Sequence, residues 1–170
     1  MSARRATAAW TPAAGIRFAT EADDIARARE LFVEYAKSLA YDLCFQGFEQ
    51  ELASLPGAYA PPRGRLLVAG EPRSAFGCIA LRPIDDTIGE VKRLFVRDAQ
   101  RGGRWGRRLA EAIIDEARAI GYWELKLDTL DSMHAARALY GSLGFCPCAP
   151  YYHNPLPGVI YMSLPLHGPR

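Results

Sequence analysis

Three glycines lie close to Arg101, Arg104, Arg107 and Arg108 near the middle of the chain, within the stretch from Val96 to Leu109. The sequence here is VRDAQRGGRWGRRL, preceded by an apolar run and followed by an amphipathic one. This pattern predicts a strand, a glycine-rich turn and the start of a helix. The first N–H groups of a helix lack internal partners, its dipole makes that end positive, and glycines let an anion approach the backbone. Such a turn can bind phosphate; the alternative is a surface helix whose arginines are merely solvated.

The residues after the turn support the predicted helix. Apolar side chains recur with helical spacing at Leu109, Ile113, Ala117 and Ile120, and charged side chains occupy the opposite face. Gly121 follows where a glycine commonly ends a helix. We therefore expect a helix whose N-terminus opens onto the glycine turn and could hold the pyrophosphate of a coenzyme.

The rest of the chain predicts strands and helices that would position this turn. Strands are expected at 16–19, 65–69, 75–81, 87–96, 123–127, from 145, and at 159–164; further helices are expected at 20–39, after a capping box from Thr20 to Asp23, and at 45–55 and 133–143. Hairpins lead into a strand–helix–strand crossover. The predicted fold is therefore α/β (α+β), with a mixed, mostly antiparallel central sheet of about six to seven strands and helices on both faces.

Length and composition indicate one globular domain. We expect residues 1–14 to form a flexible tail and residues 15–170 a single domain. The formal net charge of +2 argues against nucleic acid and membrane partners. Cys146 and Cys148 are too close for a comfortable disulfide and lack the usual metal-ligand spacing, so no metal is expected even though His153 is near. Free thiols and no secretory signal indicate a cytoplasmic protein.

Two motifs resemble those of the GCN5-related N-acetyltransferase (GNAT) superfamily. The segment from Arg101 to Gly106 aligns with the family pattern Q/R-x-x-G-x-G/A, although Arg104 occupies the place of the middle glycine. The segment from Ala136 to Phe145 matches the pattern A-x-x-L-Y-x-x-x-G-F in full. The resemblance spans about residues 15 to 166 and implies acetyl-coenzyme A as cosubstrate.

The resemblance also implies where the coenzyme lies. The strand that ends at Val96 would run beside the pantetheine arm, and its backbone N–H groups would hold the thioester carbonyl. The glycine turn would hold the pyrophosphate. The residues expected to bind the coenzyme are Leu94, Phe95, Val96, Arg101, Gly102, Gly103, Arg104, Trp105, Gly106 and Arg107.

Two residues are catalytic candidates by the same resemblance. Tyr140 would protonate the coenzyme A sulfur; the alternative is a core tyrosine on an apolar helix face. Glu90 would accept the amine proton, directly or through water; the alternative is a charged strand residue paired with Lys92 or Arg93. The acceptor-binding candidates follow the first helix or lie in the proline-rich loop near the C-terminus: Tyr41, Phe45, Tyr152 and His153.

The expected activity is acetyl transfer from acetyl-coenzyme A to an amine of a small molecule or a protein. The amine would attack the thioester directly, with no covalent enzyme intermediate. The alternative is a non-catalytic acyl-coenzyme A-binding sensor that keeps the phosphate turn without turnover. A homodimer is possible in either case.

Overall fold

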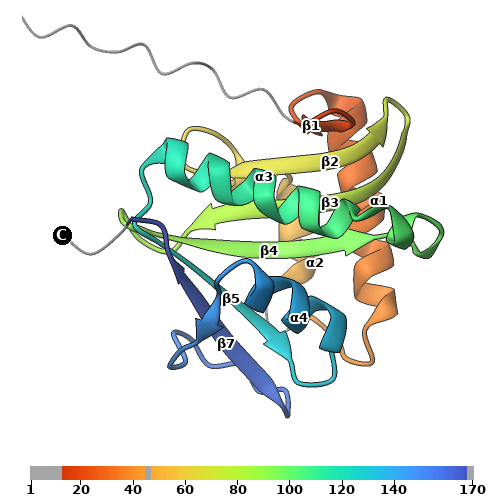
Figure 1. Cartoon of the computed structure of the whole chain (residues 1–170). Helices are drawn as coiled ribbons and strands as arrows, with labels where there is room; N and C mark the ends of the chain where they lie inside the picture. Colours follow the sequence, from red (N-terminus) through yellow and green to blue (C-terminus); the bar gives the residue numbers. More distant parts are fainter. Residues whose placement is uncertain (1–12, 45–46, 168–170) are drawn as a thin grey trace, which may run out of the picture.

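The computed structural model describes residues 13–44 and 47–167. Its centre is a seven-stranded sheet in the order β1-β2-β3-β4-β5-β7-β6 (Figure 1). The neighbours β4 and β5 run parallel, whereas every other neighbouring pair is antiparallel. The predicted mixed, mostly antiparallel sheet is thus confirmed. The strands are β1 (Ile16–Phe18), β2 (Arg65–Glu71), β3 (Ser74–Pro83), β4 (Ile88–Val96), β5 (Glu124–Leu130), β6 (Cys146–Pro147) and β7 (Val159–Pro165).

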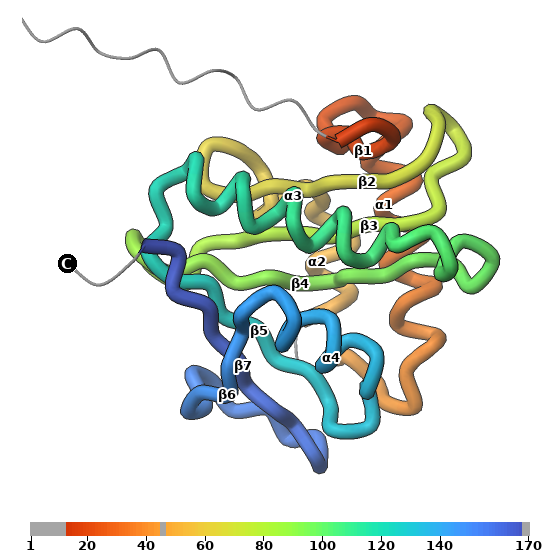
Figure 2. Tube along the Cα trace, viewed as in Figure 1, coloured from red at the N-terminus to blue at the C-terminus, as the bar shows by residue number. Residues whose placement is uncertain are grey.

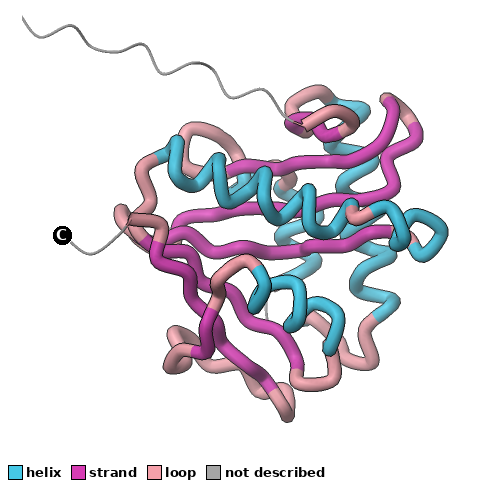
Figure 3. Tube along the Cα trace, viewed as in Figure 1, coloured by secondary structure: helices cyan, strands magenta, loops and turns pink. Residues whose placement is uncertain are grey.

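Helices cover both faces of the sheet, as predicted, and Figure 3 distinguishes them from the strands. Alternating side chains of β2 explain why two layers form: Leu67 and Ala69 enter one core, whereas Leu66 and Val68 enter the other. The first core includes residues of α3 and α4, and the second includes residues of α1. The helices are α1 (Ala22–Ser38), α2 (Phe48–Ser54), α3 (Trp105–Ile120) and α4 (His134–Ser142), with short 3-10 turns η2 (Gly57–Tyr59) and η3 (Asp98–Gly103).

One predicted helix end is present in the structure, and one predicted helix start is not. Gly121 ends α3 in the left-handed region, with φ +100°, and its N–H bonds the carbonyls of Ala117 and Arg118. The predicted capping box from Thr20 is wrong, because Glu21 is the N-cap of α1 and makes no side-chain cap bond. None of the described helices is long and apolar enough to cross a membrane. Residues 1–12, most of the predicted tail, lie outside the described residues.

The parallel strands β4 and β5 are paired at one end only. The ladder joins Ile88–Glu90 to 124–126 and goes no further, although β4 continues to Val96 and β5 to Leu130. The two strands diverge beyond this ladder, as the tube in Figure 2 makes visible. Two sheet strands that stop pairing leave room between them for a cavity, and α4 forms one of its walls.

Candidate active site

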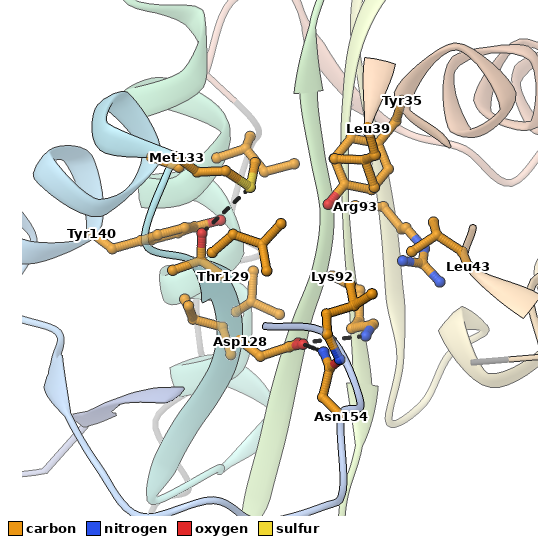
Figure 4. Close-up of a pocket in the computed structure, with 16 residues that line it drawn as sticks. Tyr35, Leu39, Leu43, Lys92, Arg93, Asp128, Thr129, Met133, Tyr140 and Asn154 are labelled. Carbon is orange, nitrogen blue, oxygen red and sulfur yellow. Dashed lines mark hydrogen bonds and ion pairs between the residues drawn. The ribbon is translucent and has the colours of Figure 1, made fainter. Parts of the chain in front are cut away.

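A cavity of about 70 Å³ lies between the separated parts of β4 and β5 (Figure 4). Its walls come from five parts of the chain: the end of α1 with the segment after it, both strands, α4 with its N-cap residue, and the loop before β7. The lining is both apolar and polar, and the polar side chains that line it are Tyr35, Lys92, Arg93, Asp128, Thr129, Tyr140 and Asn154. The strand divergence therefore brings together side chains that are far apart in sequence.

A β-bulge lies in β4 where this strand lines the cavity. Cys78 pairs with Phe95 but Ala80 pairs with Lys92, so β4 carries one extra residue here. Arg93 occupies the left-handed region, with φ +61°, and its carbonyl accepts a hydrogen bond from the Cys78 thiol at 3.3 Å. A bulge takes backbone groups out of the regular ladder. The backbone near Leu94 can therefore bind a ligand carbonyl.

The Arg93 side chain stabilises this bend from the other face of the sheet. Its Nε and Nη2 atoms donate to Glu51 Oε2 on α2, at 3.1 and 2.7 Å. Both side chains are almost fully buried, at 3% and 11% exposure. A buried guanidinium requires such a carboxylate, because an unpaired charge in this position would be strongly destabilising.

Tyr140 lies on α4 and lines the cavity, as Figure 4 shows. The residue is only 7% exposed, and its ring contacts Phe145 edge to face at a centroid distance of 5.4 Å. Burial raises the pKa of the Tyr140 hydroxyl, so the group stays protonated through the neutral range. The sequence motif thus places a proton donor at the cavity, and its role as an acid stays a prediction.

Glu90 lies on β4 just outside the cavity lining, in a buried charge network. It is 3% exposed and accepts hydrogen bonds from Arg82 at 2.7 Å and from the Tyr151 hydroxyl at 2.9 Å. Lys92 Nζ is 3.7 Å from Glu90 Oε1, and burial lowers the pKa of Lys92. The pairing of Glu90 with Lys92, the alternative raised by the sequence, is present. The role of Glu90 as a base stays a prediction.

Asp128 lies on β5 and faces Lys92 across the gap, with 3.7 Å between Oδ1 and Nζ. The Tyr152 hydroxyl and Asn154 Nδ2 donate to Asp128 Oδ2 at 2.6 and 2.8 Å. The sequence predicted a strand ending at residue 127 and singled out neither Asp128 nor Asn154. Only the register of β5 against β4, together with the loop that precedes β7, brings these groups to one cavity.

The other acceptor candidates have different positions. Tyr152 reaches the edge of the cavity through Asp128, whereas the neighbouring His153 is exposed. Tyr41 is 39% exposed and does not line the cavity, although Leu39 and Leu43 on either side of it do. Phe45 lies outside the described residues.

The glycine turn leads into an uncapped helix N-terminus. Arg104 is the N-cap of α3 in the left-handed region, with φ +58° and ψ +21°, and makes no side-chain cap bond. The left-handed region favours glycine, and a glycine is the residue that the family pattern has at this position. Arg108 donates a backbone bond to the Arg104 carbonyl at 3.1 Å. The N–H groups of residues 105–107 precede this bond and find no acceptor among the described residues.

Space around this end of α3 suits an anion. A Cβ atom at Gly106 would meet only Leu139 of α4, at an ordinary contact distance of 3.6 Å. A Cβ atom at Gly102 would meet nothing within 4 Å. Free N–H groups at a helix N-terminus with open space in front fit a pyrophosphate, so the residues present suit the expected coenzyme.

The predicted coenzyme-binding side chains have varied contacts. The Trp105 indole packs against Phe76 at 4.9 Å and covers Gly15, so this side chain belongs to the core rather than to the anion site. Arg107 contacts Glu111 and the Ser142 hydroxyl, and the contact with Ser142 joins α3 to α4. Arg101 is 62% exposed and pairs with Asp98 at 2.9 Å. Trp105 and Arg107 can still offer their backbone N–H groups.

Metal ligands do not gather at the cavity. Within the described residues, no group of three or more His, Cys, Asp or Glu side chains could hold a metal ion. The described cysteines, Cys44, Cys78, Cys146 and Cys148, are free thiols.

Comparison with known proteins identifies the family of this chain. The sequence of residues 25–145 matches the acetyltransferase (GNAT) family. An uncharacterized N-acetyltransferase of Schizosaccharomyces pombe is 43% identical over 136 residues, which cover 79% of this chain and 83% of the relative. An IAA acetyltransferase of Azospirillum brasilense is 42% identical over 111 residues, which cover 63% of this chain and 71% of the relative.

A solved structure has the same fold. The Salmonella typhimurium protein yncA, determined with its cofactor acetyl-CoA, superposes with a TM-score of 0.66. The match covers 91% of this chain and 95% of that protein at 24% identity. Family match, close relatives and fold agree, and the chain described here belongs to the GNAT family of acetyltransferases.

Proposed function

We propose that this chain transfers an acetyl group from acetyl-coenzyme A to an amine of a small molecule or a protein. One observation carries the proposal: a buried tyrosine hydroxyl and the bulged backbone of β4 line the same cavity. The uncapped N-terminus of α3 lies next to α4, which carries that tyrosine. Membership of the family and the acetyl-CoA of the Salmonella protein support the choice of coenzyme.

Each group has one task in this proposal. The N–H groups at the start of α3 bind the pyrophosphate, and the backbone N–H groups near Leu94 polarise the thioester carbonyl. The neutral amine attacks the carbonyl carbon directly. The C–S bond breaks as the Tyr140 hydroxyl gives a proton to the departing sulfur. No covalent enzyme intermediate is needed.

A non-catalytic sensor of acyl-coenzyme A is the competing function. Such a module needs the phosphate turn but gains nothing from a proton donor in the cavity. The Tyr140 side chain lines the cavity, and the described residues offer its hydroxyl no hydrogen-bond partner, so this group is available to a ligand in the cavity. Tyr140 therefore favours the enzyme over the sensor.

Two measurements test the proposal in sequence. Acetyl-coenzyme A at about a hundredfold over its dissociation constant should stabilise the fold by roughly 2.7 kcal/mol. For a chain of this size, that corresponds to a rise in melting temperature of roughly 5–10 °C. An amine library incubated with acetyl-coenzyme A should then release free thiol and yield an N-acetyl product.

The two results separate the functions. No melting shift at millimolar acetyl-coenzyme A would refute both the enzyme and the sensor. A melting shift without thiol release for any amine would favour the sensor.

A further inference from the structure

Asp128 carries the only carboxylate among the described residues that line the cavity. Glu90 and Lys126 form the last ladder pair of β4 and β5. Lys92 and Asp128 each lie two residues further along their strands. Because side chains alternate between the two faces of a strand, both lie on the same face of the sheet as Glu90 and Lys126. The two charges therefore face each other where the strands separate, as the dashed line in Figure 4 shows.

The two oxygens of Asp128 have different surroundings. Oδ2 accepts hydrogen bonds from the Tyr152 hydroxyl at 2.6 Å and from Asn154 Nδ2 at 2.8 Å. Asn154 Nδ2 is also 3.1 Å from the Tyr152 hydroxyl, so the two donors support each other. Oδ1 faces Lys92 Nζ at 3.7 Å, beyond hydrogen-bond distance. The carboxylate is thus fixed through one oxygen, and the other can accept a further donor.

We propose that Asp128 Oδ1 binds the amine of the acceptor and takes its first proton; this inference rests on the proposed function. The neutral nitrogen then forms a bond to the acetyl carbon, and the C–S bond breaks. The second amine proton replaces the one that Tyr140 gives to the sulfur. The products are one amide, one thiol and one proton. Asp128 holds this proton and passes it to solvent.

Lys92 assists this transfer by its charge. A cationic ammonium bound at Asp128 would lie close to the ammonium of Lys92, and like charges disfavour the protonated amine. Glu90 holds Lys92 from the other side, with 3.7 Å between the charged atoms. Lys92 and Glu90 are thus positioning residues, whereas Asp128 touches the acceptor.

The same surroundings select the class of acceptor. Both cations at the cavity are already paired, Arg93 with Glu51 and Lys92 with Glu90 and Asp128. A carboxylate next to the reacting amine would therefore meet Asp128 without a cation available to balance it. Leucines, Met133 and tyrosine rings form much of the remaining wall. A primary amine at the end of a narrow alkyl chain fits better than an α-amino acid.

Ethylamine and glycine form a matched pair of probes for this inference. They differ in one group, a methyl against a carboxylate, beside the same amine. At saturating acetyl-coenzyme A, the wild-type chain should acetylate ethylamine with a kcat/KM at least about tenfold higher than glycine, a difference of about 1.4 kcal/mol. This comparison uses unmodified protein, so it holds even if a variant fails to fold.

Three variants then locate the proton acceptor, with ethylamine as probe. Asp128→Asn keeps the shape but removes the charge and the basic oxygen, so kcat/KM should fall by about 10²- to 10⁴-fold. The acetyl-coenzyme A melting shift should stay at the wild-type value in this variant. Glu90→Gln should lose less activity than Asp128→Asn. Asp115→Asn, on the exposed face of α3, is the surface control and should match the wild type.

Several results would overturn the inference. These are full activity in Asp128→Asn, a larger loss in Glu90→Gln than in Asp128→Asn, or a higher kcat/KM for glycine. Failure of the wild type to acetylate ethylamine while the coenzyme shift persists would also overturn it, yet leave the proposed function standing. Failure of acetyl-coenzyme A to bind would instead refute the proposed function.

Discussion

Replacing Tyr140 by phenylalanine removes one hydroxyl and keeps the ring against Phe145. A typical hydrogen bond contributes about 0.5–1.5 kcal/mol, and the described residues offer this hydroxyl no partner, so the free energy of unfolding should change by less than about 0.5 kcal/mol. That is a melting shift below about 2 °C for a chain of this size. A positioned acid is worth about 10²- to 10⁴-fold in rate, so kcat should fall by that factor.

Turnover, coenzyme affinity and melting temperature should be measured on the same Tyr140→Phe protein. Loss of kcat with unchanged coenzyme affinity is the signature of an interaction made only in the transition state. Because burial raises the pKa of Tyr140, the wild-type rate should not fall on the alkaline side through loss of this proton up to about pH 10, the ordinary tyrosine value.

Tyr122→Phe is the matched control. Tyr122 is fully buried, but its hydroxyl donates to the Arg63 carbonyl at 2.9 Å and it does not line the cavity. This variant should lose about 1 kcal/mol of stability and keep its kcat. Full turnover in Tyr140→Phe would refute the acid role. A joint loss of stability and coenzyme binding would instead identify a structural hydroxyl.

Two further predictions concern the glycine turn. Gly106→Val should weaken acetyl-coenzyme A binding far more than Arg108→Ala, because a side chain would intrude on the phosphates; equal affinities by calorimetry would contradict this. Arg108 stacks on the Trp105 ring at 3.9 Å, so its variant should lose some stability instead. Arg104→Gly should raise the melting temperature without coenzyme by about 2–4 °C, because relief of a left-handed backbone is worth about 1 kcal/mol. An unchanged or lower melting temperature would exclude strain at this position.

Local patterns predicted most of the fold because apolar residues recur with one spacing in helices and another in strands. The helix after the glycine turn and the Gly121 stop could be read from residues close in sequence, and both are present. The bulge at Arg93 had no such signal, since a non-glycine residue with φ +61° is uncommon. Its partner Glu51 lies on another element, beyond the reach of periodicity.

The candidate site divides in the same way. The motif around Tyr140 led directly to the cavity, because the motif itself sets which side of α4 packs inward. Asp128 was not a candidate, since the predicted strand ended at residue 127 whereas β5 continues to Leu130. Its role depends on where β4 and β5 stop pairing and on the loop that carries Asn154. Such juxtapositions arise from tertiary structure and leave no mark on local sequence.

The crystal structure of this chain with acetyl-coenzyme A bound would test the central claim most directly. The account predicts the pyrophosphate at the backbone N–H groups of residues 105–107. It also predicts the thioester oxygen within hydrogen-bond distance of the backbone between Leu94 and Val96, and the sulfur next to the Tyr140 hydroxyl. Phosphates bound away from the start of α3, or an acetyl group outside the cavity between β4 and β5, would contradict it.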